Sequence, residues 1–201
     1  MEESRKFLLQ SWVIGILLAL DLAASLYLYS LVHTGFAFVS FFVTLFVLLV
    51  FALLPAIDPH RANYSRFSDT FRFVRLGVVL TLVVLHWLLI LGYALGWQVS
   101  AETAVLTALG VLWIGIGNVM GRIKKQTWFF GTANPWTLSD EGVWTRTQRL
   151  GSRVWVIAGL VLIVGGIIGG RDGWILLVAL VVVGALIPHV YSYFDYRKIH
   201  K

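Results

Sequence analysis

The sequence contains no cysteine, which excludes disulfide bonds, thiolate nucleophiles and thiolate metal sites. Charged residues are also scarce, at 13% of the 201 residues, whereas soluble domains have about 25%. No stretch matches the HExxH zinc motif, the GxSxG nucleophile motif or the Walker phosphate loop. The five histidines are scattered without the spacing of metal ligands. The sequence therefore predicts that the protein is not an enzyme and has neither a metal site nor a cofactor.

Apolar residues dominate instead, at 59% of the chain with a mean hydropathy of +0.84. A domain of this size cannot bury so much apolar surface in its own core, so the lipid bilayer is the expected solvent. Backbone groups in lipid must pair within each segment, and about 20 apolar residues cross the membrane as a helix. The sequence predicts an all-α integral membrane protein, a six-transmembrane helical bundle that forms a single transmembrane domain over 1–201. The predicted spans are 7–32, 36–57, 73–97, 101–120, 153–170 and 174–195.

Basic residues are distributed unevenly between the predicted connections. Both ends and the connections after spans two and four carry all of the Lys and Arg residues except Arg171. The positive-inside rule then places the N and C termini in the cytoplasm and requires an even number of spans. The net charge is +6. We interpret the basic residues as contacts to anionic lipid headgroups and expect no direct binding of nucleic acid. Since the outer connections are only a few residues long, a ligand arriving from outside must be met within the bilayer or at its surface.

Two ionisable side chains lie near the middle of predicted spans, Asp21 in the first and His86 in the third. Such residues normally face the interior of the bundle and have partners. Because the two lie at similar depth, they could meet. One interpretation is a proton-linked or ligand-binding pair, and the other is a hydrogen bond that only fastens two helices.

Glycines spaced four apart occur in two spans, in three GxxxG pairs: Gly117 with Gly121, Gly165 with Gly169, and Gly166 with Gly170. Small residues at this spacing let helix backbones approach closely. They mark either an oligomer interface or packing within one chain.

The two basic connections hold the remaining polar signals. In the first, Asp58 precedes Pro59, where it is expected to cap a short segment carrying Arg61 and Asn63. In the second, the stretch NPWTLSDEGVW (134–144) contains helix-start signals. Thr137 with Asp140 fits a capping box, and Ser139 is a rival N-cap.

From Val143 onward, apolar and basic residues follow a helical period, with Arg146, Arg149 and Arg153 on the polar face. This predicts an interfacial amphipathic helix in the cytoplasmic loop between spans four and five. It either anchors the bundle in the headgroup layer or offers a docking surface to a partner.

This second loop resembles the signature of the SdpI-type immunity protein family, over about 117–160. The matching features are Gly121, a basic and aromatic stretch, Gly131, the run Pro-Trp-Thr-Leu-Ser at 135–139, two acidic residues, Trp144 and the run Arg149-Leu150-Gly151. The first basic loop, with Asp58, Arg61 and Asn63, resembles the family's earlier loop. The chain departs from the family at Ala133 and Asn134, where Arg and Thr are usual, and at Gln148, where His is common.

The resemblance implies a protein of the prokaryotic cell membrane that protects against a secreted, membrane-active peptide toxin. It also implies signalling, in which a small cytoplasmic DNA-binding repressor is held at the membrane. The residues expected to bind ligand or partner are Pro135, Trp136, Thr137, Ser139, Trp144 and Arg149, with Asp58, Arg61 and Asn63 in the first loop. The alternatives are a small transporter or proton-coupled carrier that uses Asp21 and His86, and an enzyme assembled from residues on distant spans.

Overall fold

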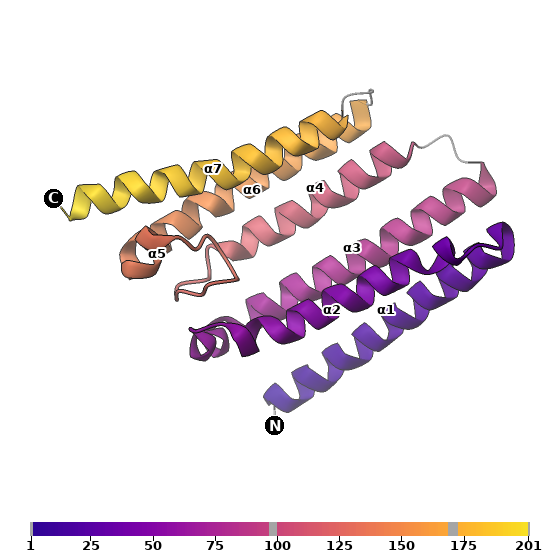
Figure 1. Cartoon of the computed structure of the whole chain (residues 1–201), viewed down its shortest axis with the longest axis horizontal. Coiled ribbons are helices and arrows are strands. Elements are labelled where there is room, and N and C mark those ends of the chain that lie inside the picture. Colours follow the sequence, from indigo (N-terminus) through magenta and orange to yellow (C-terminus); the bar gives the residue numbers. More distant parts are fainter. Residues whose placement is uncertain (1, 97–99, 169–172, 201) are drawn as a thin grey trace.

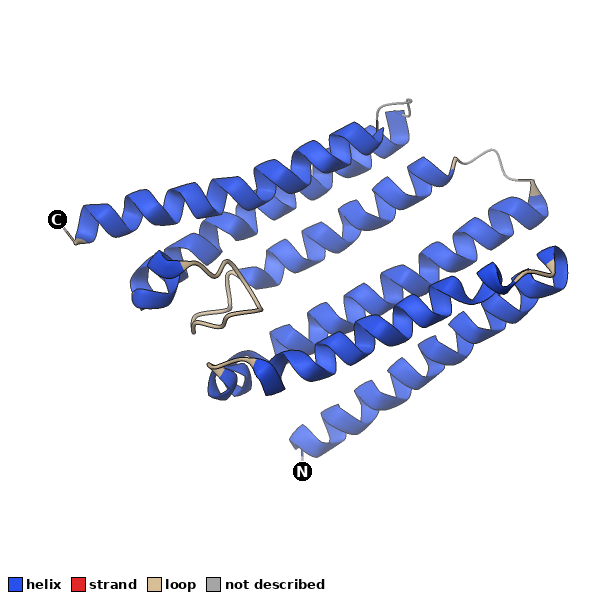
Figure 2. Cartoon of the chain, viewed as in Figure 1, coloured by secondary structure: helices blue, strands red, loops and turns tan. Residues whose placement is uncertain are grey.

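The computed structural model describes residues 2–96, 100–168 and 173–200, and within these ranges it is helical and without strands (Figure 2). The elements are α1 (Glu2–Val32), η1 (Gly35–Phe38), α2 (Val39–Ile57), η2 (Arg61–Phe67), α3 (Ser68–Leu95), α4 (Ala101–Met120), α5 (Pro135–Ser139), α6 (Glu141–Ile168) and α7 (Gly173–Ile199). The side chains are described from residue 11 onward.

Six of these helices are long and apolar enough to cross a membrane, which confirms the predicted fold class. The helix α4 has the predicted bounds, whereas α6 begins at Glu141 rather than at residue 153. The amphipathic segment expected as a separate loop helix is therefore the first part of α6, continuous with the span. Its burial explains the continuity, since Val143, Trp144 and Thr147 pack inside the protein. A position at the membrane interface stays a prediction.

The long helices form two halves, α1 to α3 and α4 with α6 and α7 (Figure 1). Both chain ends, η2 and α5 lie at the same end of the bundle, which we call the terminal side. The connections after α1 and α3 lie at the opposite end, the far side. This arrangement is the one expected of an even number of spans.

The closest helix packing joins α4 and α6 and depends on two glycines that face one another. A methyl group at Gly110 would lie 2.6 Å from the carbonyl oxygen of Gly159, and a methyl group at Gly159 would lie 2.6 Å from that of Gly110. Real Cβ atoms do not approach so closely, so the crossing exists because both positions lack a side chain. About two turns further along α4, a methyl group at Gly117 would lie 2.8 Å from the carbonyl oxygen of Ser152.

The predicted GxxxG glycines also pack within the chain where they are described. Gly117 faces α6, Gly165 faces Leu176 of α7, and Gly166 faces Leu106 of α4. Gly169 and Gly170 lie outside the described residues. These contacts account for the small residues by internal packing, and an oligomer interface stays a prediction.

Candidate functional site

The first basic loop is joined to the second by the carboxylate of Asp58, which is only 2% exposed. One oxygen, Oδ1, accepts the backbone N–H of His60 at 2.7 Å. The other, Oδ2, accepts the backbone N–H of Trp128 at 2.9 Å and the hydroxyl of Tyr64 at 3.0 Å. The expected capping role of Asp58 is therefore correct only for the bond to His60. Its larger role is a bond across the two halves of the bundle.

A second hydrogen bond runs beside it. The side-chain amide of Asn63 donates to the backbone carbonyl of Gln126 at 2.7 Å. Arg61, in contrast, is exposed, and its hydrogen bond is made by the backbone, whose N–H donates to the carbonyl of Asp58 at 3.0 Å. We call the bonds of Asp58 and Asn63 to the second loop the loop lock.

An aromatic cluster lies against the loop lock. Its buried members are Tyr64, Phe67, Phe71, Met120, Ile123 and Trp144. Phe130 from the second loop stacks on Phe67, with ring centroids 5.7 Å apart. The indole N–H of Trp144, which is fully buried, donates to the carbonyl of Ile123 at 2.8 Å. Trp144 is thus a core residue that holds α6 beneath the second loop.

A short helix that was not predicted, α5, precedes the amphipathic helix, and its cap is Asn134. The start of the amphipathic helix, α6, is capped by Asp140 rather than by Thr137 or Ser139. Asn134 is extended (φ −156°, ψ 171°), and its side-chain oxygen accepts the backbone N–H groups of Trp136 and Thr137. The hydroxyl of Thr137 accepts the N–H of Asn134 at 3.0 Å and completes a capping box. The fixed φ of Pro135 suits the first helical position, so α5 starts at this residue. Ser139 is exposed in the last turn of α5.

Asp140 ends this short helix and starts α6. Its Oδ1 accepts the backbone N–H of Val143 at 2.8 Å. This bond is the main reason that the pKa of Asp140 is lowered, with smaller contributions from the N–H of Gly142 and from His200 and Arg146. An ionised side chain here also favours the N-terminal end of the helix dipole.

The six residues predicted to bind a partner in this loop divide into two groups. Thr137 and Trp144 are buried and structural. Pro135, Ser139 and Arg149 are exposed, and Trp136 is half-buried against the ring of Tyr193 in α7, at 5.1 Å between centroids. Only the exposed group and Trp136 are available to another molecule.

Sequence reasoning missed a contact between the loop and α7. The side-chain amide of Asn134 donates to the hydroxyl of Ser192 at 2.8 Å, and both residues are buried. An Asn that precedes Pro-Trp is a recognisable N-cap signal, whereas the bond to a serine 58 residues away has no signature in the sequence.

Gln148, where the family commonly has His, is fully buried under the second loop. A methyl group at Gly131, which has φ +113°, would lie 2.9 Å from its Nε2 atom. Neither polar atom of the Gln148 amide has a hydrogen-bond partner among the described residues. The glycine is needed both for its backbone angle and for the close approach of this amide.

Asp21 and His86 do meet, as their similar depth allows. The Nδ1 atom of His86 lies 2.6 Å from Oδ1 of Asp21, with the side chains 6% and 0% exposed. No group of three or more possible metal ligands lies close together in the part of the chain that the structure describes. The pair is therefore an isolated link between α1 and α3.

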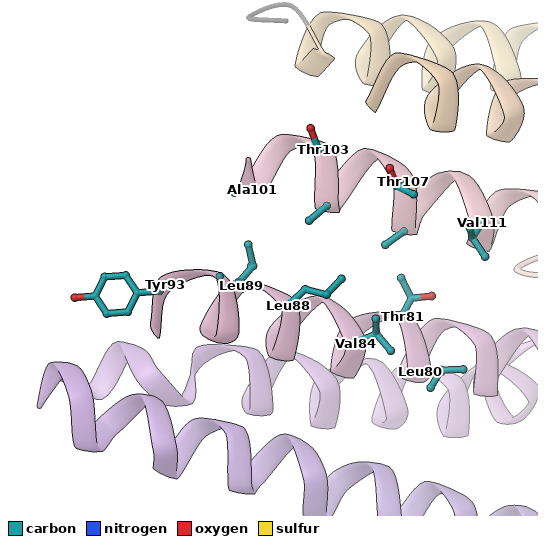
Figure 3. A pocket seen from close by; sticks show the side chains of 13 residues that line it. Leu80, Thr81, Val84, Leu88, Leu89, Tyr93, Ala101, Thr103, Thr107 and Val111 are labelled. Atoms are coloured by element: carbon teal, nitrogen blue, oxygen red, sulfur yellow. The ribbon is translucent and has the colours of Figure 1, made fainter. Parts of the chain in front are cut away.

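A groove of about 630 Å³ lies between α3 and α4, near the far side (Figure 3). Leu80, Val84 and Leu88 line it from α3, and Ala104, Ala108 and Val111 are among the residues that line it from α4. The hydroxyl oxygens of Thr103 and Thr107 point away from α3 (Figure 3). The groove is therefore apolar, and it opens where the two halves are not joined by the loop lock.

These features define a class, the multi-pass helical membrane proteins, here with two halves joined by polar loops at one end. Residues 124–192 match the model of the SdpI/YfhL protein family. The chain is also 30% identical over 123 residues to the Immunity protein SdpI of Bacillus subtilis (strain 168), an alignment that covers 61% of this chain and 58% of that protein. The two matches confirm the resemblance to the SdpI-type family seen in the second loop. The chain spans less than two thirds of the length of this relative. No solved structure matches the chain significantly.

Proposed function

We propose that this protein protects the membrane of its cell against a secreted, membrane-active peptide. The proposal follows from its similarity to a protein named for immunity, and the groove between α3 and α4 is the observation that supports it. The groove is near the far side, which the distribution of basic residues predicts to be outside. A peptide arriving from outside would meet no folded domain there, because α1 and η1 are separated only by His33 and Thr34.

The dimensions of the groove suit an apolar peptide segment. Its α3 wall runs from Leu80 to Tyr93, which is about 20 Å of helix at a rise of 1.5 Å per residue. On the α4 wall, the small side chains of Ala104 and Ala108 would let a bound helix approach the backbone. The proposed interaction is therefore capture of a peptide helix within the bilayer, along α3 and α4.

Filling the groove is expected to remove protection. In Ala104→Trp the indole would occupy the space in which the peptide is proposed to lie. Cells that express this variant should be as sensitive as cells without the protein, at equal levels of protein in the membrane. The measurement is survival and membrane potential of cells exposed to a panel of secreted membrane-active peptides.

The matched control is Ile157→Trp, because Ile157 is 61% exposed on α6 and does not line the groove. This variant should protect as well as the wild type. If the wild-type chain protects against none of the peptides, the immunity proposal is wrong. If Ala104→Trp protects fully, the immunity proposal stands and the groove is not the binding site.

We also propose that the terminal side holds a cytoplasmic DNA-binding repressor, as the resemblance implies. The support is a surface of exposed basic and aromatic side chains on the two loops and the first part of α6, namely Arg61, Lys124, Trp128, Phe129 and Arg149. Trp128 and Phe129 follow the loop lock directly, and their backbone N–H groups face Asp58. The loop lock thus holds two aromatic side chains outward, as a rigid binding surface requires.

Reversing one charge on this surface is expected to weaken repressor binding at least tenfold, because buried or aligned charge contacts at interfaces are worth about 1.4 kcal/mol or more. The variant is Arg149→Glu, and the control is Lys198→Glu at the exposed end of α7. Binding of a purified small repressor encoded beside the gene would be measured on vesicles that contain the full chain. If both variants bind the repressor with the affinity of the wild type, this surface is not the binding site. If the wild-type chain does not bind the repressor at all, the proposed signalling role is wrong.

The contact of Asp21 with His86 is the observation that favours the alternative function, a carrier. Neither residue lines the groove, whose α3 wall is formed by other positions on that helix. The described residues therefore do not connect the pair to a substrate path, and we do not extend the proposal to transport.

A further inference from the structure

A second, smaller cavity lies in line with the groove between α3 and α4. This inner cavity, of about 290 Å³, lies beneath the second loop, and its wall includes Val74 of α3 and Val119 of α4. Thr81 and Val111 line the end of the groove nearer the terminal side, which we call its inner end (Figure 3). Val74 and Val119 are seven and eight residues from them toward the terminal side, and residues at these spacings share one face of a helix. The groove and the inner cavity therefore lie along the same line between the two halves of the bundle.

Two reciprocal contacts separate these cavities. A methyl group at Gly77 of α3 would lie 3.5 Å from Cδ1 of Leu112, so the Leu112 side chain packs on α3 where that helix has no side chain. A methyl group at Gly115 of α4 would lie 3.8 Å from Cε1 of Phe73, so the Phe73 ring packs on α4 in the same manner. On α4, Leu112 and Gly115 fall between the last residue that lines the groove and the first that lines the inner cavity. We call the side chains of Leu112 and Phe73 the partition.

The groove is shorter than a membrane span because it ends at the partition. At a rise of 1.5 Å per residue its α3 wall is about 20 Å long, and α4 continues for about 13 Å beyond Val111 to Met120. A helix lying along the α3 wall would have about 13 residues in the groove, whereas about 20 are needed to cross the hydrocarbon core. The part of a peptide that fills the groove is therefore less than a complete span.

The polarity of the groove differs between its two ends. At the inner end, the hydroxyl of Thr81 donates to the carbonyl of Gly77 at 2.8 Å and is already used. No charged residue is among the described residues that line the groove. Tyr93, which is 69% exposed, lies at the opposite end (Figure 3). Because an unpaired charge in an apolar site is costly, the inner part of a ligand must be uncharged, and its polar part must lie near Tyr93.

We propose that Leu112 and Phe73 stop a bound peptide part of the way across the membrane, an inference that rests on the peptide capture proposed above. The class of ligand is a peptide with an uncharged, apolar leading segment of about 13 residues and a polar part that stays at the far side. Its leading end would lie against the partition and would not enter the inner cavity. The protein would thus hold the peptide as an incomplete span, which cannot connect the two surfaces of the bilayer.

The test is photo-crosslinking of the full chain in lipid vesicles. The probe is a synthetic helix of leucine and alanine of about 20 residues, enough to span the bilayer, with a pair of lysines at one end. One version has a photoreactive leucine at the opposite end, and a second version has it beside the lysines. Crosslinks that excess unlabelled peptide displaces are located by mass spectrometry. With both versions we expect them on residues that line the groove and none on Ile116 or Val119, which line the inner cavity.

Removing the partition should extend the crosslinks. In Leu112→Ala we expect Ile116 to be crosslinked with the yield seen at Val111. The matched control is Leu186→Ala, because Leu186 is 56% exposed on α7 and lines neither cavity; its pattern should be that of the wild type. Ala104→Trp should lose the crosslinks in the groove.

The possible results separate this inference from the proposed function. Crosslinks at Ile116 in the wild type would show that the partition does not stop the peptide, while the groove remains its binding site. An unchanged pattern in Leu112→Ala would also overturn the role of the partition. No displaceable crosslink in the groove would contradict both the groove as the binding site and this inference. Crosslinks confined to the groove in a chain that protects no cell would contradict immunity and leave the partition supported. If Leu112→Ala fails to insert, Phe73→Ala tests the other contact with the same measurement, at a side chain that is 50% exposed.

Discussion

Gly159→Ala is expected to separate α4 from α6 and to cause one of the largest losses of stability available to a single methyl group in this protein. The new Cβ would lie 2.6 Å from the carbonyl oxygen of Gly110 and 3.0 Å from the backbone nitrogen of Ile114. Backbone atoms on the partner helix cannot move aside as a flexible side chain does, so the helices must shift. Overpacking of this kind costs about 1–3 kcal/mol, and we expect the upper end of that range or more. Unfolding in mixed micelles with increasing denaturing detergent would measure the loss.

The control is Gly15→Ala, because a methyl group at Gly15 in α1 would meet nothing within 4 Å. That change should be neutral or slightly stabilising, since alanine favours the helix. The reciprocal variant Gly110→Ala should resemble Gly159→Ala, because the contact is the same one seen from the other helix. Equal stability of Gly159→Ala and Gly15→Ala would contradict the close crossing of α4 and α6.

Asp58→Ala is expected to open the loop lock. The change removes the acceptor of the N–H groups of His60 and Trp128 and of the Tyr64 hydroxyl. Hydrogen bonds to a charged group are worth about 1.5–3 kcal/mol each. We therefore expect a loss of about 3 kcal/mol or more in the free energy of unfolding. Limited proteolysis should also cut the second loop faster.

Two variants make this prediction specific. Arg61→Ala removes an exposed side chain from the same loop and should change neither stability nor proteolysis. Asp58→Asn keeps the shape of the side chain, but its amide has one acceptor oxygen, and its NH2 group is a donor that would face other donors. The stability of Asp58→Asn should therefore be closer to that of Asp58→Ala than to that of the wild type. Proteolysis of Asp58→Ala at the rate of Arg61→Ala would show that the loops are held by the aromatic cluster without the carboxylate.

The sequence predicts the six spans well because their determinants are local. Each span is a run of apolar residues that needs no partner to be recognised, and α4 at Ala101–Met120 has the predicted bounds. The contact between Asp21 and His86 was predictable for a related reason. Polar groups in lipid have few possible partners, and these two lie at similar depth.

The interior of the second loop was less predictable because its contacts are distant in the sequence. The cap of the amphipathic helix was assigned to Thr137 or Ser139, both good capping residue types, whereas Asp140 caps it and a separate short helix, α5, follows Asn134. Likewise, GxxxG spacing indicated Gly117, but Gly110 and Gly159 lie on different helices. Spacing along one helix contains no information about the helix opposite.

The loop lock also has a consequence for the order in which the chain is assembled. Asp58 precedes Trp128, whose backbone it binds, by 70 residues. During synthesis, at about 5–20 residues per second, α1 to α3 are made and inserted seconds before that partner leaves the ribosome. Asp58 therefore has no partner from the second loop until Trp128 has been synthesised. The loop lock is completed only after the second loop has followed the first three helices.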